Sequence, residues 1–178
     1  MTVPNPRTWI AGVTAFVATT MNETRDAFNF LMGRGAGCKE YARLVVNANV
    51  TTTTGVVIAV PFNAEDWDTR GGHSVTTFPS AYTFQDGGKY RVSGQIAYAG
   101  NPTGDRCAQI RANSFNVIAA VQQKAGGSYD TYLSFAFDYQ FVAGDYIEVI
   151  ALQNCGGPLS LISNALGGTF MVVEWVAV

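Results

Sequence analysis

The stretch KYRVSGQIAY, residues 89–98, decides the fold class of this chain. Its larger apolar side chains alternate with polar ones along the whole stretch. One face would carry Tyr90, Val92, Gly94, Ile96 and Tyr98. The other face would carry Arg91, Ser93, Gln95 and Ala97. A period of two residues is typical of a β-strand with one buried face, so the sequence predicts a half-buried antiparallel strand here.

The same alternation recurs on both sides of this stretch. YLSFAFDYQF at 132–141 places four aromatic residues and a leucine on one face, and RCAQIRA at 106–112 alternates in the same way. Segments rich in Gly, Asn and Pro separate the runs, at 85–88, 100–104 and 154–158. Regular strands and turns with no helical period after residue 33 predict an all-β sandwich or barrel.

Two further stretches are apolar on both faces. They are DYIEVIALQ at 145–153 and TFMVVEWVAV at 169–178. A strand of this kind must be covered on both sides, whereas one outer face of a two-sheet sandwich meets water. We therefore expect these strands at a subunit interface, although some apolar exposure is normal for protein surfaces. The predicted interface residues are Tyr146, Ile147, Val149, Met171, Val173 and Trp175.

The composition of the chain excludes several classes of function. The 178 residues include 11 Lys and Arg against 13 Asp and Glu, and this balance lacks the basic character of a nucleic-acid-binding protein. The one histidine and three cysteines show no zinc-ligand spacing. No glycine-rich loop opens a helix, and no nucleophile stands with a base and an acid. We predict a protein that is not an enzyme and has no cofactor and no metal.

A short acidic segment is the candidate for surface recognition. Asp66, Trp67 and Asp68 lie together, and His73 follows in a glycine-rich turn. Oxygen ligands could hold Ca²⁺, and Trp67 could stack on a sugar. The third interpretation is a solvated acidic turn at 65–68 with an aromatic ring packed beneath it, and an exposed turn histidine.

The N-terminal segment RTWIAGVTAFVATTMNETRDAFNFLMG, residues 7–33, has a different character. Its apolar run is shorter than the roughly 20 residues that span a bilayer, so we expect no membrane insertion. Thr20 and Glu23 fit a capping box, and apolar residues follow at helical spacing until Gly33. The sequence predicts an extended arm, one short α-helix and a glycine-rich hinge over 1–37, followed by a β-domain over 38–178.

The order of landmarks after residue 40 resembles the C1q/TNF-like jelly roll. That family combines an early F…D element, a Phe before a G-x-Y-x-V strand, a G-D-x-V-x-V strand and a closing strand. The matching residues here are Phe62, Asp68, Phe84, Gly88, Tyr90, Val92, Gly144, Asp145, Ile147, Val149, Gly168 and Phe170. The resemblance implies a ten-stranded jelly-roll sandwich that works as a compact homotrimer. It also implies that an inner sheet containing both the GDYIEV strand and the closing strand makes the trimer contacts.

The N-terminal segment is similar to the start of tailed-bacteriophage virion proteins. Trp9, Gly12, Met21, Asn22, Arg25, Asp26, Asn29, Phe30 and Leu31 carry this similarity. It implies a virion protein whose arm docks on other phage proteins of the tail or the capsid, and whose β-domain faces outward, where a host-surface glycan or protein could bind. Tail fibre or minor tail protein, head decoration protein and secreted C1q-like binding protein are the three alternatives, with the tail favoured. The predicted docking residues are Trp9, Ile10, Phe16, Met21, Phe28, Phe30 and Leu31.

Overall fold

The computed structural model describes residues 40–163 and 167–177. The predicted arm, helix and hinge, all seven docking residues and the proposed domain boundary lie outside the described residues. The described part is entirely β-structure and turns, which confirms the predicted all-β class. Its twelve strands are β1 (Tyr41–Val45), β2 (Val50–Thr52), β3 (Ile58–Ala59), β4 (Ala64–Asp68), β5 (Ala81–Thr83), β6 (Gly88–Tyr98), β7 (Asp105–Ala112), β8 (Asn116–Lys124), β9 (Thr131–Phe141), β10 (Tyr146–Gln153), β11 (Leu159–Leu161) and β12 (Phe170–Ala177).

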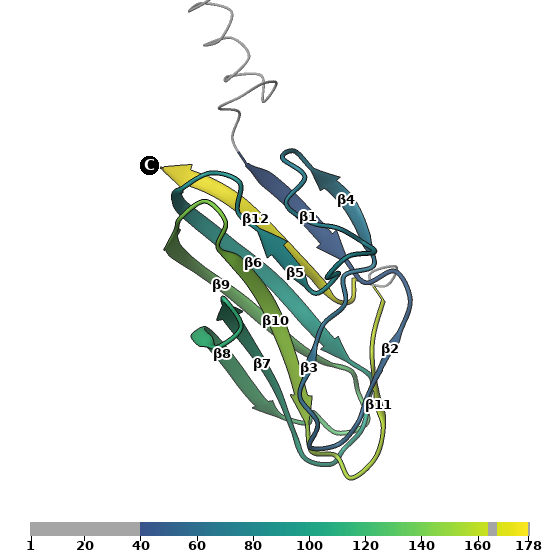
Figure 1. Cartoon of the computed structure of the whole chain (residues 1–178). Coiled ribbons are helices and arrows are strands. Elements are labelled where there is room, and N and C mark those ends of the chain that lie inside the picture. Colours follow the sequence, from purple (N-terminus) through teal and green to yellow (C-terminus); the bar gives the residue numbers. More distant parts are fainter. Residues whose placement is uncertain (1–39, 164–166, 178) are drawn as a thin grey trace, which may run out of the picture. The chain divides into compact units, whose positions relative to one another are not determined.

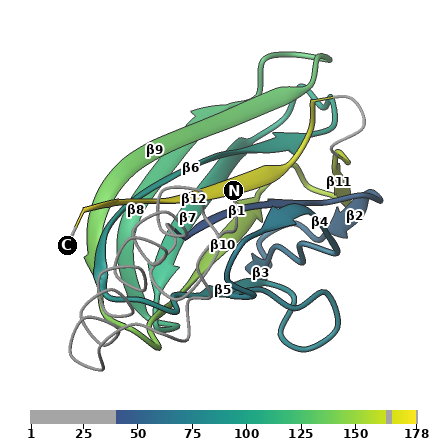
Figure 2. The same cartoon turned by 90° about the horizontal axis from the view of Figure 1, so that it is seen from above.

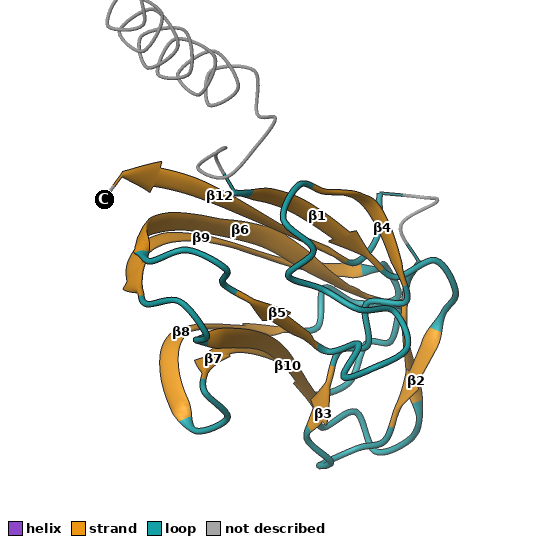
Figure 3. Ribbon diagram, turned by 45° about the horizontal axis from the view of Figure 1, so that its top comes forward, coloured by secondary structure: helices purple, strands orange, loops and turns teal. Residues whose placement is uncertain are grey.

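The strands form two facing sheets (Figure 1). Sheet A has seven strands in the order β2-β11-β6-β12-β1-β4, with β9 paired to β6. Sheet B has five strands in the order β3-β10-β7-β8, with β5 paired to β10. Figures 2 and 3 show the two layers from other directions. The resemblance implied ten strands and the described part has twelve, of which β2, β3, β5 and β11 are short segments of two or three residues.

The stretch KYRVSGQIAY belongs to β6, which lies between the edge strand β9 and β12 in sheet A. It pairs with β9 along its whole length and with β12 on its other side. Tyr90, Val92 and Ile96 are fully buried between the sheets, which confirms the predicted inward face. Gly94 keeps the alternation without a side chain, because a Cβ there would lie 2.5 Å from the Phe170 carbonyl oxygen and 2.6 Å from the Phe135 ring. The glycine thus lets an aromatic ring of β9 pack onto the backbone of β6.

One lateral side of the sandwich is formed by two edge strands. Each sheet ends there in an edge strand, β9 in sheet A and β8 in sheet B (Figure 1). The inward-facing rings of Phe135 and Phe137 are only partly buried, and that of Tyr139 is 36% exposed. An edge strand of eleven residues presents a long row of unpaired backbone groups. This side of the sandwich is therefore suited to cover by another chain.

Candidate functional site

The acidic segment predicted as a turn is strand β4, which corrects that expectation. β4 pairs with β1 across a bulge between Arg43 and Leu44. The strand directs Trp67 to the outer face of sheet A, where its ring stacks on Tyr41 at 5.5 Å. Arg43 forms an ion pair with Asp66 and lies 5.9 Å from the centre of the Trp67 ring. Trp67 and Asp66 therefore belong to a paired surface of aromatic and charged side chains.

Asp68 and His73 have structural roles instead. The Asp68 carboxylate accepts hydrogen bonds from the backbone N–H groups of Arg70, Gly71 and His73 at 2.9–3.0 Å. The His73 ring is fully buried, with Nδ1 2.7 Å from Glu65 and Nε2 3.1 Å from the Pro79 carbonyl oxygen. The structure thus contradicts the expectation of an exposed turn histidine. Both side chains hold the loop between β4 and β5 in one conformation.

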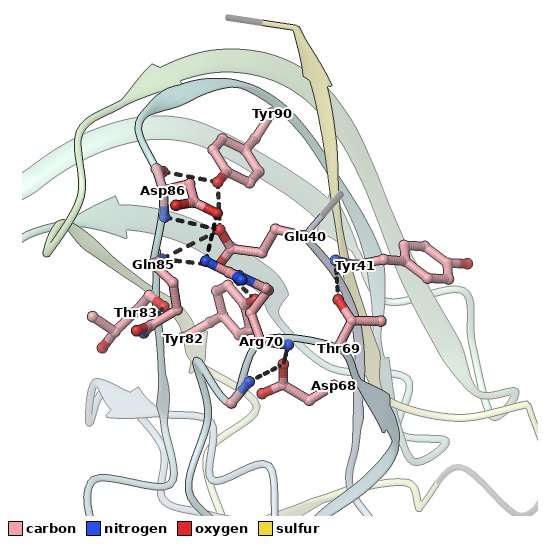
Figure 4. Close-up of polar contacts among 11 residues, drawn as sticks. Glu40, Tyr41, Asp68, Thr69, Arg70, Tyr82, Thr83, Gln85, Asp86 and Tyr90 are labelled. Atoms are coloured by element: carbon pink, nitrogen blue, oxygen red, sulfur yellow. Dashed lines mark hydrogen bonds and ion pairs between the residues drawn. The ribbon is translucent and has the colours of Figure 1, made fainter. Parts of the chain in front are cut away.

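A buried carboxylate holds the beginning of β1. Glu40 is 1% exposed and accepts hydrogen bonds from the hydroxyls of Tyr82 and Tyr90 (Figure 4). It also accepts hydrogen bonds from the backbone N–H groups of Gln85, at 3.0 Å, and Asp86, at 3.2 Å. Four donors compensate the charge of this carboxylate, as a buried ion requires. The cluster connects the first residue of the described chain to the loop that precedes β6.

The tyrosines of this core are held in their neutral form. Burial raises the pKa of Tyr82 well above its ordinary value, and the adjacent Glu40 raises it further. Burial and the hydrogen bond to Glu40 raise the pKa of Tyr90 in the same way. Burial also raises the pKa of Tyr98, whose hydroxyl donates to the Cys107 carbonyl oxygen at 2.9 Å. These groups stabilise the domain and are not poised for proton transfer.

The two strands predicted at a subunit interface lie in different sheets. β10 is in sheet B and β12 is in sheet A, so they do not share the single inner sheet that the resemblance implied. The side chains of four of the six predicted interface residues are fully buried within the protomer. They are Ile147, Val149, Met171 and Val173. These four pack between the two sheets and do not reach a subunit contact, whereas Tyr146 and Trp175 are partly exposed.

The outer face of β10 is covered by the chain itself. Ser80 donates a hydrogen bond to Glu148 at 2.8 Å, and the Phe78 ring meets the Tyr146 ring edge-on at 5.4 Å. Ile150 on the same face is 5% exposed. The loop before β5 therefore provides the second cover that the sequence pattern of β10 requires.

Within residues 40–163 and 167–177, no three histidine, cysteine or acidic side chains gather as metal ligands. The same residues contain no helix of the length and apolarity needed to cross a bilayer. Cys107 and Cys155 carry free thiols, and burial raises the pKa of Cys107. Among the described residues, the two ring nitrogens of His73 contact Glu65 and the Pro79 carbonyl oxygen, so this histidine has no hydroxyl or thiol nucleophile as a partner.

The structure contains a pocket that the sequence interpretation missed. A cavity of about 360 Å³ opens beside the loop between β4 and β5. It is lined by Gly71, Gly72, His73, Ser74, Thr77, Phe78, Ala81, Thr83 and Gln85. The signal that could have indicated it is the Gly-Gly pair before a Ser/Thr-rich segment that ends in an aromatic residue.

Comparisons with known proteins establish the fold. No family model matches the chain, and no curated protein matches its sequence. The crystal structure of murine APRIL superposes with a TM-score of 0.59 at 15% identity, over 78% of this chain and 99% of that chain. The globular domain of zebrafish complement 1qA gives 0.58 at 12%, over 78% and 97%. Eiger TNF from S. frugiperda gives 0.59 at 15%, over 78% and 93%. The β-domain of this chain is a jelly roll of the TNF/C1q type.

Proposed function

We propose that this chain is a bacteriophage virion protein whose jelly-roll domain forms a homotrimeric knob on the particle surface. The jelly-roll fold supports the proposal of a trimeric knob, since the C1q/TNF-like family that the sequence resembles works as trimers. The similarity of residues 7–33 to tailed-phage virion proteins supports the particle as its location. The partners are two further copies of the chain and the virion protein that receives the arm.

The main observation in support of a trimer is the distribution of exposed apolar side chains. One group lies on β8, β9 and their flanking turns, and we name it the edge patch: Phe115, Val117, Tyr129, Tyr132, Tyr139 and Val142. A second group lies on the outer side of sheet A, and we name it the face patch: Tyr41, Trp67 and Val176, with the partly buried Phe170 and Val172 beside them. Apolar groups gathered in patches of this kind indicate association surfaces.

Two different patches on one molecule favour a ring. When the edge patch of one copy packs on the face patch of the next, the contact is heterologous, and it closes into a ring when the rotation between neighbouring copies divides a full turn. Such packing would cover the unpaired backbone groups of β9 and the half-buried rings of Phe135 and Phe137. Three copies close this ring in the proposed knob.

The arm provides the attachment in this proposal. Burial of each large apolar side chain contributes about 1.5–3 kcal/mol before ordering costs are subtracted. Three arms on one trimer bind together, so the whole knob dissociates far more slowly than a single arm would. We place the knob at the tail, where contact with the host surface gives an outward-facing domain a role.

Immunogold electron microscopy of intact particles tests the location. Antibody against the β-domain is expected to label the tail. Labelling over the head would refute the tail location and indicate a capsid decoration protein. Absence of label from purified particles that infect normally would refute a virion role. Deletion of residues 1–32 is expected to leave a folded trimer that no longer enters particles, and normal incorporation of that variant would refute the anchoring role of the arm.

A further inference from the structure

The pocket beside the loop between β4 and β5 has a rigid frame. Asp68 accepts from three backbone N–H groups of this loop, and the His73 ring connects Glu65 to the Pro79 carbonyl oxygen. The backbone N–H of Thr83 donates to the Gly72 carbonyl oxygen at 2.7 Å. A Cβ at Gly72 would lie 2.4 Å from the Thr83 carbonyl oxygen, so only glycine allows this close approach. Because these contacts are internal, the cavity is formed before any ligand arrives.

The lining of the pocket is neutral and rich in hydrogen-bonding groups. Apart from the bonded His73 ring, the described residues that line it include no carboxylate, lysine or arginine. In the described part of the chain, the hydroxyl of Thr77 has no hydrogen-bond partner, and Gln85 uses only its Nε2, toward the Thr83 carbonyl oxygen at 3.0 Å. Figure 4 shows Thr83 and Gln85 on the segment beside the Glu40 cluster. The pocket therefore offers donors and acceptors without the charge that a phosphate or carboxylate ligand would need.

The pocket is lined by an aromatic residue, Phe78, whose backbone is strained. Phe78 is 50% exposed, and its φ of 56° lies in the left-handed region that a bulky residue rarely adopts. Strain of this kind persists where the surrounding structure enforces it, and it gathers at ligand sites. The ring rests edge-on against Tyr146, which fixes its orientation. An exposed aromatic face beside hydroxyl and amide groups is the arrangement that binds the apolar face and the hydroxyls of a sugar ring.

We propose that this pocket binds a neutral sugar, with Phe78 stacking on the ring and Thr77 and Gln85 bonding its hydroxyls. The volume of about 360 Å³ lies near the lower end of small-molecule pockets, which favours a terminal sugar over a long extended chain. The proposal that this sugar belongs to a glycan on a cell surface rests on the proposed function. Sugar binding itself depends only on the folded β-domain.

Saturation-transfer NMR of the full chain tests the proposal with free D-glucose, D-galactose, D-mannose, L-rhamnose and N-acetyl-D-glucosamine, each at up to about 50 mM. At least one sugar is expected to receive saturation. Phe78→Asn removes the ring and tolerates a positive φ, and it is expected to weaken binding at least about fivefold. Thr77→Val is expected to weaken it as well. Val57→Asn is the matched control, since Val57 is an exposed apolar side chain outside the pocket and outside both patches, and it is expected to bind as the native chain does.

Absence of saturation transfer to every sugar overturns the proposal, and so does a signal that Phe78→Asn leaves unchanged. Binding of a peptide library at Phe78 in place of these sugars would also overturn it. The thermal midpoint of each variant verifies that it folds. A chain that binds sugar but never labels particles would refute the virion role and leave the pocket intact, so the two failures are distinguishable.

Discussion

Replacement of Glu40 by Gln is the sharpest test of how the β-domain is held together. Glu40 accepts hydrogen bonds from four donors while it is almost completely buried: two tyrosine hydroxyls and two backbone N–H groups. The Gln amide keeps the shape but presents an NH₂ group to some of these donors. A hydroxyl can rotate to accept, and the N–H of Gln85 reaches both oxygens of Glu40, at 3.0 and 3.2 Å. The N–H of Asp86 reaches one oxygen and cannot rotate, so it loses its acceptor when the NH₂ group takes that place.

The expected loss of unfolding free energy is about 2–4 kcal/mol, because bonds to a charged group contribute about 1.5–3 kcal/mol each and an orphaned buried donor costs about 1–3 kcal/mol. Urea denaturation of the native chain and the variant at one protein concentration measures it. Glu174→Gln is the matched control: Glu174 is exposed on β12, and its replacement is expected to change stability by less than about 0.5 kcal/mol. A loss for Glu40→Gln as small as that of the control would refute the reasoning.

Three further predictions concern titration, packing and assembly. The pKa values of Tyr82, Tyr90 and Tyr98 are raised in the folded state. Above the ordinary tyrosine pKa of about 10, the unfolded chain therefore loses these protons before the folded chain does. The free energy of unfolding is expected to fall by up to about 1.4 kcal/mol per pH unit for each tyrosine. Urea titrations on either side of this pH measure the fall, and a flat profile contradicts it. Gly94→Ala places a Cβ against the Phe170 carbonyl oxygen and is expected to cost about 1–3 kcal/mol in the same assay, while Gly126→Ala, where a Cβ meets open space, is the control. Val176→Arg puts a charge in the face patch and is expected to dissociate the trimer in sedimentation experiments. Val56→Arg, at an exposed position outside both patches, is expected to leave it assembled; equal behaviour of the two variants would contradict the proposed contact.

The alternation in β6 and β9 could be read from sequence because it is local. A period of two on one face identifies which side chains point inward, and Tyr90, Val92 and Leu133 lie where that period places them. The order of strand and turn landmarks also indicated the jelly-roll class that the structural comparisons establish.

The interface prediction rested on a pattern that has two physical causes. β10 is apolar on both faces, and a strand period does not distinguish a partner subunit from a loop of the same chain. Here the loop that contains Phe78 and Ser80 covers the outer face. His73 shows the same limit, because its glycine-rich neighbours suggest an exposed turn while distant groups, Glu65 and the Pro79 carbonyl oxygen, bury the ring. Contacts between residues far apart in sequence leave no local pattern.

The solution mass of the full chain tests the central claim of a homotrimeric knob most directly. Light scattering coupled to size exclusion, run over a dilution series, separates a trimer from weaker association. The account predicts a particle of three times the chain mass of 19.1 kDa that persists on dilution. A particle with the mass of a single chain at every concentration would contradict it.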